Sequence, residues 1–95
     1  MKMIRYQLRP SFLVVAPELR DCLPPKPQDY LDSLRSSVLA SGVLEPLVAW
    51  RGCDLLVDGH VRLELARRYG IRCRVELRPF AGMDEAIAYR KMVNG

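Results

Sequence analysis

The sequence lacks any hydrophobic run that could cross a membrane. Its longest uncharged apolar run, from Phe12 to Pro17, falls far short of the roughly 20 residues that a membrane-spanning helix needs. The charged N-terminal residues 1–5 are followed by no apolar segment of signal-peptide length and by no cleavage site of small residues. We therefore expect a cytoplasmic protein with no membrane partner.

Cysteine and histidine are also scarce. The three cysteines, Cys22, Cys53 and Cys73, are odd in number, far apart and in no Cys-x-x-Cys pair. This spacing predicts reduced thiols rather than a disulfide framework. A zinc site made from them and the only histidine, His60, would lack both a fourth ligand and the usual paired spacing, so no metal site is expected.

Acidic and aromatic residues are in the minority. The 95 residues, enough for one small domain, contain 15 Lys and Arg against 11 Asp and Glu, which gives a formal net charge of +4. This charge allows a phosphate, a nucleic acid or an anionic surface as partner, and it is also ordinary for a soluble domain. Aromatic residues make up 7% of the chain, so we expect them in the core rather than stacked on bases.

Hydrophobic periodicity and turn residues predict an alternation of strands and helices. We expect strands over residues 4–8, 12–16, 46–50, 55–57 and 72–77, and helices over 28–41, 60–69 and 83–93. Gly42 and Gly70 follow two of the helices as stop signals, and the prolines within 24–27 favour an extended connector. This order predicts the α+β fold class.

One junction joins the end of an expected strand to the start of a helix, at Asp58-Gly59-His60-Val61-Arg62. The first turn of a helix has unpaired N–H groups and a partial positive charge, so it can hold an anion. Gly59 would let a ligand approach the backbone closely, and His60 and Arg62 would donate to a bound phosphate. A purely structural interpretation stays open, in which Asp58 caps the helix, Gly59 forms a tight turn and Arg62 is solvated.

Two motifs within residues 28–78 resemble the N-terminal domain of the ParB/sulfiredoxin-like superfamily. The first ends a helix and enters a strand, as Ser37-x-x-x-x-Gly42-x-x-Glu45-Pro46-Leu47. The second is the signature Asp58-Gly59-x-x-Arg62-x-x-x-Ala66-x-x-x-Gly70. The resemblance implies the α+β fold of that superfamily, a small mixed sheet flanked by about three helices.

The resemblance also implies a ligand. Where partition proteins usually place Gly-Glu-Arg-Arg against a nucleotide triphosphate, this chain has Gly59-His60-Val61-Arg62. These four positions would bind a nucleotide or another phosphate, with CTP or another nucleotide plus Mg²⁺ as cofactor. His60 and Val61 depart from that pattern, which argues against CTP turnover. Sulfiredoxins have their nucleophilic cysteine at the position of His60, so sulfinic-acid reduction is not expected.

The implied setting is DNA-associated work such as plasmid partition, regulation or a mobile element, with a homodimer as one form the protein could take. Partition proteins read DNA with a downstream helix-turn-helix region, for which 95 residues leave no room. We expect residues 1–95 to form one ParB N-terminal-like domain, either standing alone or as a fragment of a longer chain. DNA-backbone contact would then come from Arg72, Arg74 and Arg78, on one face of an expected strand that Glu76 interrupts. The alternation with apolar residues also predicts that Arg72, Arg74, Glu76 and Arg78 share a face exposed to water, and this solvated face is the other interpretation.

Two other functions stay open. An enzyme of the same fold, a phosphotransferase or a nuclease, would need a general acid or base, for which Asp58, His60 and Glu64 are the candidates. A protein-interaction or dimerisation module with a degenerate pocket is the other.

Overall fold

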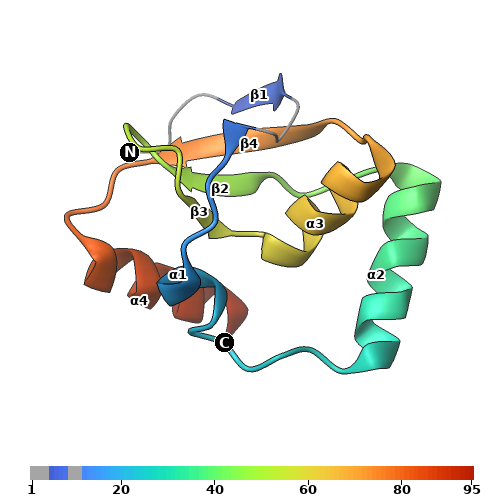
Figure 1. Ribbon diagram of the computed structural model, residues 1–95, viewed down its shortest axis with the longest axis horizontal. Helices are drawn as coiled ribbons and strands as arrows, with labels where there is room; N and C mark the ends of the chain where they lie inside the picture. The colour runs from blue at the N-terminus through green and yellow to red at the C-terminus, as the bar shows by residue number, and fades with distance from the viewer. Residues whose placement is uncertain (1–4, 9–11) are drawn as a thin grey trace.

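The protein folds as a four-stranded sheet with helices on both faces (Figure 1). The computed structural model describes residues 5–8 and 12–95. The strands are β1 (Arg5–Leu8), β2 (Leu47–Trp50), β3 (Leu56–Asp58) and β4 (Cys73–Arg78). The helices in the described ranges are α1 (Pro17–Arg20), α2 (Gln28–Ser41), α3 (His60–Tyr69) and α4 (Met83–Asn94).

The sheet is mixed, with strand order β1-β4-β2-β3. β2 and β3 form an antiparallel hairpin, and α3 then carries the chain to β4, which pairs parallel to β2 with Val75 opposite Leu47. β1 completes the sheet antiparallel to β4, with Leu8 opposite Cys73. The architecture therefore confirms the predicted α+β fold class and its small mixed sheet.

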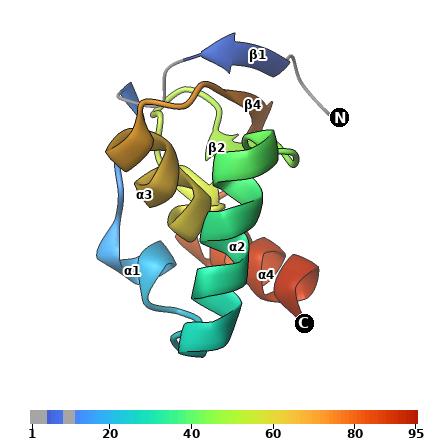
Figure 2. The ribbon, with the colours of Figure 1, turned by 90° about the vertical axis from the view of Figure 1, so that its right-hand side faces the viewer.

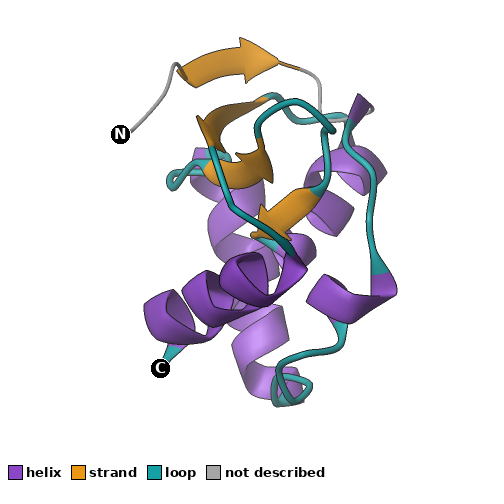
Figure 3. Ribbon diagram, turned by 90° about the vertical axis from the view of Figure 1, so that its left-hand side faces the viewer, coloured by secondary structure: helices purple, strands orange, loops and turns teal. Residues whose placement is uncertain are grey.

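Alternating side chains on the strands separate two hydrophobic cores. In β2, Leu47 and Ala49 pack toward α3, whereas Val48 packs toward α1 and α4. The core on the α3 side contains Leu13, Leu47, Ala49, Leu56, Leu63, Ala66, Cys73 and Val75. The core on the α1 and α4 side contains Ala16, Leu19, Val48, Val57 and Ala86. In Figure 3, α4 runs below the strands toward the C-terminus.

The longest described helix, α2, lies outside α3 rather than on the sheet (Figure 2). Val38 is its one buried residue. An extended segment that contains the predicted proline-rich connector leads from α1 to α2. Neither α2 nor any other helix in the described part of the chain is long and apolar enough to span a membrane.

The helices predicted over 28–41 and 60–69 are confirmed, each followed by its glycine. The strand predicted from residue 4 is confirmed over Arg5–Leu8, and Ile4 lies outside the described residues. The strand predicted over 12–16 is wrong, because within that segment only Val14 forms a bridge, parallel to Leu55. The chain turns instead into α1, which the sequence analysis did not predict, with Pro17 as its first residue and Leu19 fully buried.

The solvated face expected for the strand at 72–77 is wrong at Glu76. This residue is only 5% exposed, and its Oε2 lies 3.0 Å from Nη1 of Arg78. Arg78 also donates to the hydroxyl of Tyr89 and lies over its ring. This face of β4 therefore contacts α4 at Arg78, and the buried carboxylate of Glu76 has a cationic partner beside it.

Candidate functional site

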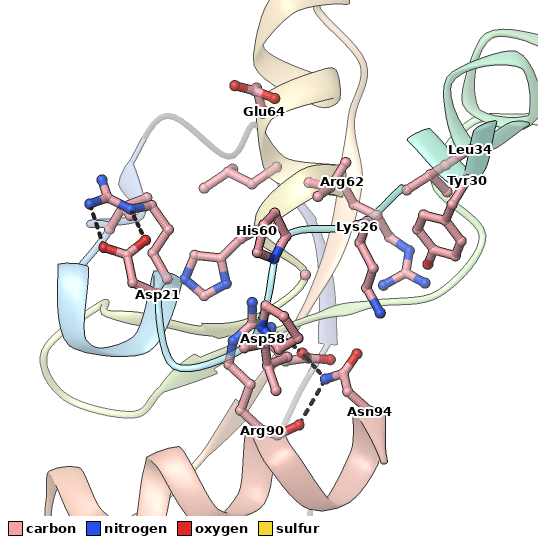
Figure 4. Close-up of a pocket in the computed structure, with 18 of the residues that line it drawn as sticks. Asp21, Lys26, Tyr30, Leu34, Asp58, His60, Arg62, Glu64, Arg90 and Asn94 are labelled. Carbon is pink, nitrogen blue, oxygen red and sulfur yellow. Dashed lines mark hydrogen bonds and ion pairs between the residues drawn. The ribbon is translucent and has the colours of Figure 1, made fainter. Parts of the chain in front are cut away.

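A cleft of about 740 Å³ opens where β3 ends and α3 begins (Figure 4). The junction residues Asp58, Gly59 and His60 line its base. One side is formed by the end of α1 and the connector, another by Tyr30 of α2, and α4 closes the remaining side with Asn94. The cleft therefore gathers residues from all four described helices and the connector around the motif that the sequence analysis singled out.

Positive charge dominates the lining of the cleft. The cationic lining residues are Arg20, Lys26, Arg62, Arg67 and Arg90, and the acidic ones are Asp21, Asp58 and Glu64. Two of the acids are neutralised within the lining, because Asp21 pairs with Arg20 at 2.8 Å and Asp58 with Arg90 at 2.7 Å. The ammonium of Lys26 lies 5.1 Å from the ring centroid of Tyr30, with no described carboxylate in ion-pair range. The lining thus has five cationic side chains against three acidic ones, a net positive charge that suits an anionic ligand.

Gly59 fixes the geometry of the junction. It is the N-cap residue of α3, in the left-handed region with φ 102° and ψ 28°. A Cβ atom at this position would lie 2.5 Å from Cδ2 of Leu47, a residue with no exposed surface. The packing of β2 against this position therefore requires a glycine.

The first turn of α3 faces the cleft without a side-chain cap among the described residues. Leu63 is the first residue whose N–H is bonded within the helix, to the carbonyl of Gly59 at 2.8 Å. The N–H groups of His60, Val61 and Arg62 precede it in the helix. No carbonyl within α3 is placed to accept from them. Free donors of this kind and the positive end of the helix dipole are the features with which helix N-termini can hold anions.

Asp58 does not cap α3, so the capping role considered from the sequence is wrong. Its Oδ1 accepts from Arg90 Nη1 at 2.7 Å and from Asn94 Nδ2 at 2.8 Å. Arg90, itself only 8% exposed, also donates its Nε to the carbonyl of Leu19 at 2.8 Å. The carboxylate is thus held toward α4 (Figure 4), where it serves as an ion-pair partner rather than a free base.

His60 presents a neutral imidazole beside the junction. Both ring nitrogens are buried, and neither has a hydrogen-bond partner among the described residues. Burial and the nearby Arg90 lower the pKa of His60 to about 4, with Arg20 adding to this and Asp58 and Asp21 opposing it. At neutral pH the ring is therefore uncharged, so it offers an anion one N–H donor but no positive charge.

The buried neutral state of His60 predicts a loss of stability in acid. The unfolded ring binds a proton near pH 6.5 and the folded ring near pH 4, so between these values the unfolded state holds more protons and stability falls as the pH is lowered. We expect this term to remove about 1–2 kcal/mol between neutral pH and pH ~4, reduced by solvent screening of the partly buried ring. Urea denaturation of the wild type and of His60→Gln at both pH values isolates the contribution of His60, because the carboxylates titrate alike in both proteins. Parallel losses in both proteins would contradict a buried neutral ring.

The other predicted residues of the motif lie at the same cleft. Val61 and Arg62 line it through the first turn of α3, and Arg62 Nη2 lies 3.7 Å from Oε1 of Glu45, whose side chain is 75% exposed. Glu64 lies one turn along α3 on the exposed side, away from the Asp58 cluster (Figure 4). The acid–base candidates Asp58, His60 and Glu64 are thus in one cleft but in three different environments.

The predicted DNA-backbone residues are placed differently from one another. Arg72 precedes β4 and is exposed. Arg74 donates to the carbonyl of Leu44 at 2.6 Å, and Arg78 is engaged by Glu76 and Tyr89. Two of the three guanidinium groups therefore already have partners within the protein.

Sequence reasoning missed Arg90 and Lys26 as residues of the site. Ala86, Arg90 and Asn94 recur every four residues, so they share one face of α4, and Ala86 is fully buried. An arginine on the apolar face of a helix requires a buried partner, and this signal was available in the sequence. Lys26 follows two prolines in the connector and carries no comparable signal.

No family model and no curated protein matches the chain. Solved structures, in contrast, do match the chain. The Pnob8-like ParB-N domain has a TM-score of 0.82 and 19% identity, covering 99% of this chain and 38% of that one. The C-terminally truncated chromosome-partitioning protein ParB from Caulobacter crescentus, complexed with CTP-gamma-S, has a TM-score of 0.79 and 18% identity, covering 97% and 53%. A further pNOB8-like ParB N-domain structure gives 0.78 and 18%, covering 99% and 35%.

The chain therefore spans between 35% and 53% of the length of these three proteins. The superposition extends over nearly all of its own residues, although fewer than one residue in five is identical. Such likeness concerns the arrangement of the backbone, which is what the two sequence motifs predicted. The chain has the fold of the ParB N-terminal domain.

Proposed function

We propose that this protein binds a nucleotide, or another phosphate-bearing ligand, in the cleft at the N-terminus of α3. The observation that carries the proposal is the uncapped first turn of α3, which opens onto a cleft with an excess of cationic side chains. One protein of similar fold, the Caulobacter crescentus ParB, is complexed with CTP-gamma-S, which supports CTP as the first nucleotide to test.

The phosphate would be held by the N–H groups of His60, Val61 and Arg62. Arg62 would add a charge-assisted contact from its side chain. Its present pairing with Glu45 is long, at 3.7 Å, and the Glu45 side chain is 75% exposed, so a phosphate could displace it. Lys26 approaches the cleft from the connector and would neutralise further charge.

Mg²⁺ would accompany the phosphates of a nucleotide. No group of three or more His, Cys, Asp or Glu residues in the described ranges is arranged to hold a metal ion. Since Mg²⁺ in nucleotide sites is commonly held by phosphates, waters and one or two carboxylates, the proposed ligand would itself supply most of its coordination.

Arg62→Ala tests this proposal directly. We expect the variant to bind nucleotide about tenfold to a hundredfold more weakly, as the loss of one charge-assisted hydrogen bond predicts. Calorimetric titrations with CTP, ATP and ADP in the presence of Mg²⁺ measure the effect. Arg68→Ala is the matched control, because Arg68 is an exposed arginine of the same helix that does not line the cleft.

A wild-type protein that binds none of these nucleotides at millimolar concentration would contradict the proposal and favour an interaction module.

We further propose a DNA-associated setting, such as partition, regulation or a mobile element, on the basis of the fold. Direct DNA contact is best tested at Arg72, the exposed member of the basic stretch. Binding that weakens steeply with salt is the expected sign of backbone contact.

A further inference from the structure

The carboxylate of Asp58 lies next to the proposed phosphate site, where a negative charge would oppose the ligand. Asp58 immediately precedes Gly59, the N-cap of α3, and both line the cleft. An aspartate near the start of a helix ordinarily turns toward the free N–H groups of the first turn. Here the side chain turns toward α4 instead (Figure 4).

Two donors from α4 converge on the same oxygen of this carboxylate. Arg90 Nη1 lies 2.7 Å and Asn94 Nδ2 lies 2.8 Å from Oδ1 of Asp58. The Arg90 and Asp58 side chains are only 10% and 18% exposed, so water screens their attraction little. The pair therefore removes most of the negative field of Asp58 from the cleft.

The donors are themselves fixed. Arg90 Nε donates to the carbonyl of Leu19 at 2.8 Å, which ties the guanidinium to α1. The amide of Asn94 donates to the carbonyl of Arg90 at 2.8 Å as well as to Asp58. Because both donors have a second anchor, the carboxylate is held in one place.

We propose that Arg90 and Asn94 are positioning residues of the anion site: they hold the Asp58 carboxylate against α4 and neutralise it, so that the first turn of α3 stays open to a phosphate. This inference rests on the proposed function. Without Arg90, Asp58 would turn to the N–H groups of α3 as an internal cap and repel an incoming phosphate. The role differs from direct contact of Arg90 with the ligand, because it acts only through Asp58.

The test compares Arg90→Met with Arg90→Met/Asp58→Asn in calorimetric titrations of the full chain with CTP and Mg²⁺. We expect Arg90→Met to weaken binding by about tenfold, the size of one unmatched charge near the site, and the added Asp58→Asn to restore most of the affinity. A double variant as weak as Arg90→Met would overturn the inference, since it would mean that Arg90 acts on the ligand directly or on the fold alone. Binding by the wild type is measured first, so that a failure of the proposed function is seen separately.

Asn94→Ala supplies a second test, because Arg90→Met leaves a partly buried carboxylate without its cation and is the variant at risk of not folding. We expect about threefold weaker CTP binding in Asn94→Ala and recovery in Asn94→Ala/Asp58→Asn. A readout that needs no ligand is the amide NMR shifts of His60 and Val61, which should move in both single variants as Asp58 turns toward α3. Unchanged shifts in the folded variants would overturn the inference even where nucleotide binding is established.

Discussion

Gly59→Ala is expected to lower the free energy of unfolding by about 3 kcal/mol. A left-handed conformation costs a residue with a side chain about 1–2 kcal/mol, and Gly59 has φ 102°. The added Cβ would also lie 2.5 Å from Cδ2 of Leu47, which has no exposed surface into which it can move, and such overpacking costs about 1–3 kcal/mol. Urea denaturation followed by the fluorescence of Trp50, the only tryptophan, measures the change.

Gly52→Ala is the matched control for this prediction. Gly52 lies in the turn between β2 and β3 with φ 99°, close to that of Gly59, and an added Cβ would meet no atom within 4 Å. Its substitution therefore has the backbone cost without the packing cost. Equal destabilisation by the two alanines would show that the contact with Leu47 relaxes freely, and would contradict the packing part of the argument.

The second large effect is expected at Arg78. Arg78→Met leaves Glu76, 5% exposed in the middle of β4, without its cationic partner, and also removes the contacts to Tyr89. Breaking a buried ion pair by removing one partner costs about 3–5 kcal/mol, and partial exposure of Arg78 reduces this to about 2–3 kcal/mol. The same urea denaturation measures the loss.

Arg72→Met is the matched control, since Arg72 is exposed just before the same strand and its loss should change stability by less than about 0.5 kcal/mol. Equal stability of Arg78→Met and the wild type would mean that Glu76 is not held by this pair. Because Arg78→Met is expected to be destabilised, weaker DNA binding by this variant has to be corrected for its folded fraction. Arg72→Met keeps its stability, so a change in its DNA binding reports contact directly.

The junction between β3 and α3 could be predicted because its signals are local. Gly59 marks the start of the helix and Gly70 its end, and the periodicity between them is helical. The same local signals also left Asp58 open as a cap, and this interpretation is wrong because Arg90, 32 residues further along the chain, binds the carboxylate. A partner at that separation leaves no trace in the spacing around the junction.

Two further differences have equally plain causes. Glu76 was expected to face water because alternation assigns every charged residue of a strand to the wet face, whereas in the structure it is buried beside Arg78, which contacts Tyr89 of α4. α1 was missed because four residues are too few to show a helical period. Its fully buried Leu19 could not be distinguished by pattern from a residue in a loop.

The contacts that Arg90 makes also bear on when the cleft forms during folding. Its hydrogen bonds reach partners 71 and 32 residues away, so they close some of the longest loops in the chain. Contacts between residues so far apart in the sequence generally form late in folding, after the local hairpin and helices. The cleft is therefore complete only once the last helix has docked, and each transient undocking of that helix dismantles it. A ligand that needs the intact cleft would suppress this opening and slow hydrogen exchange along α4, including its first turn, which does not line the cleft.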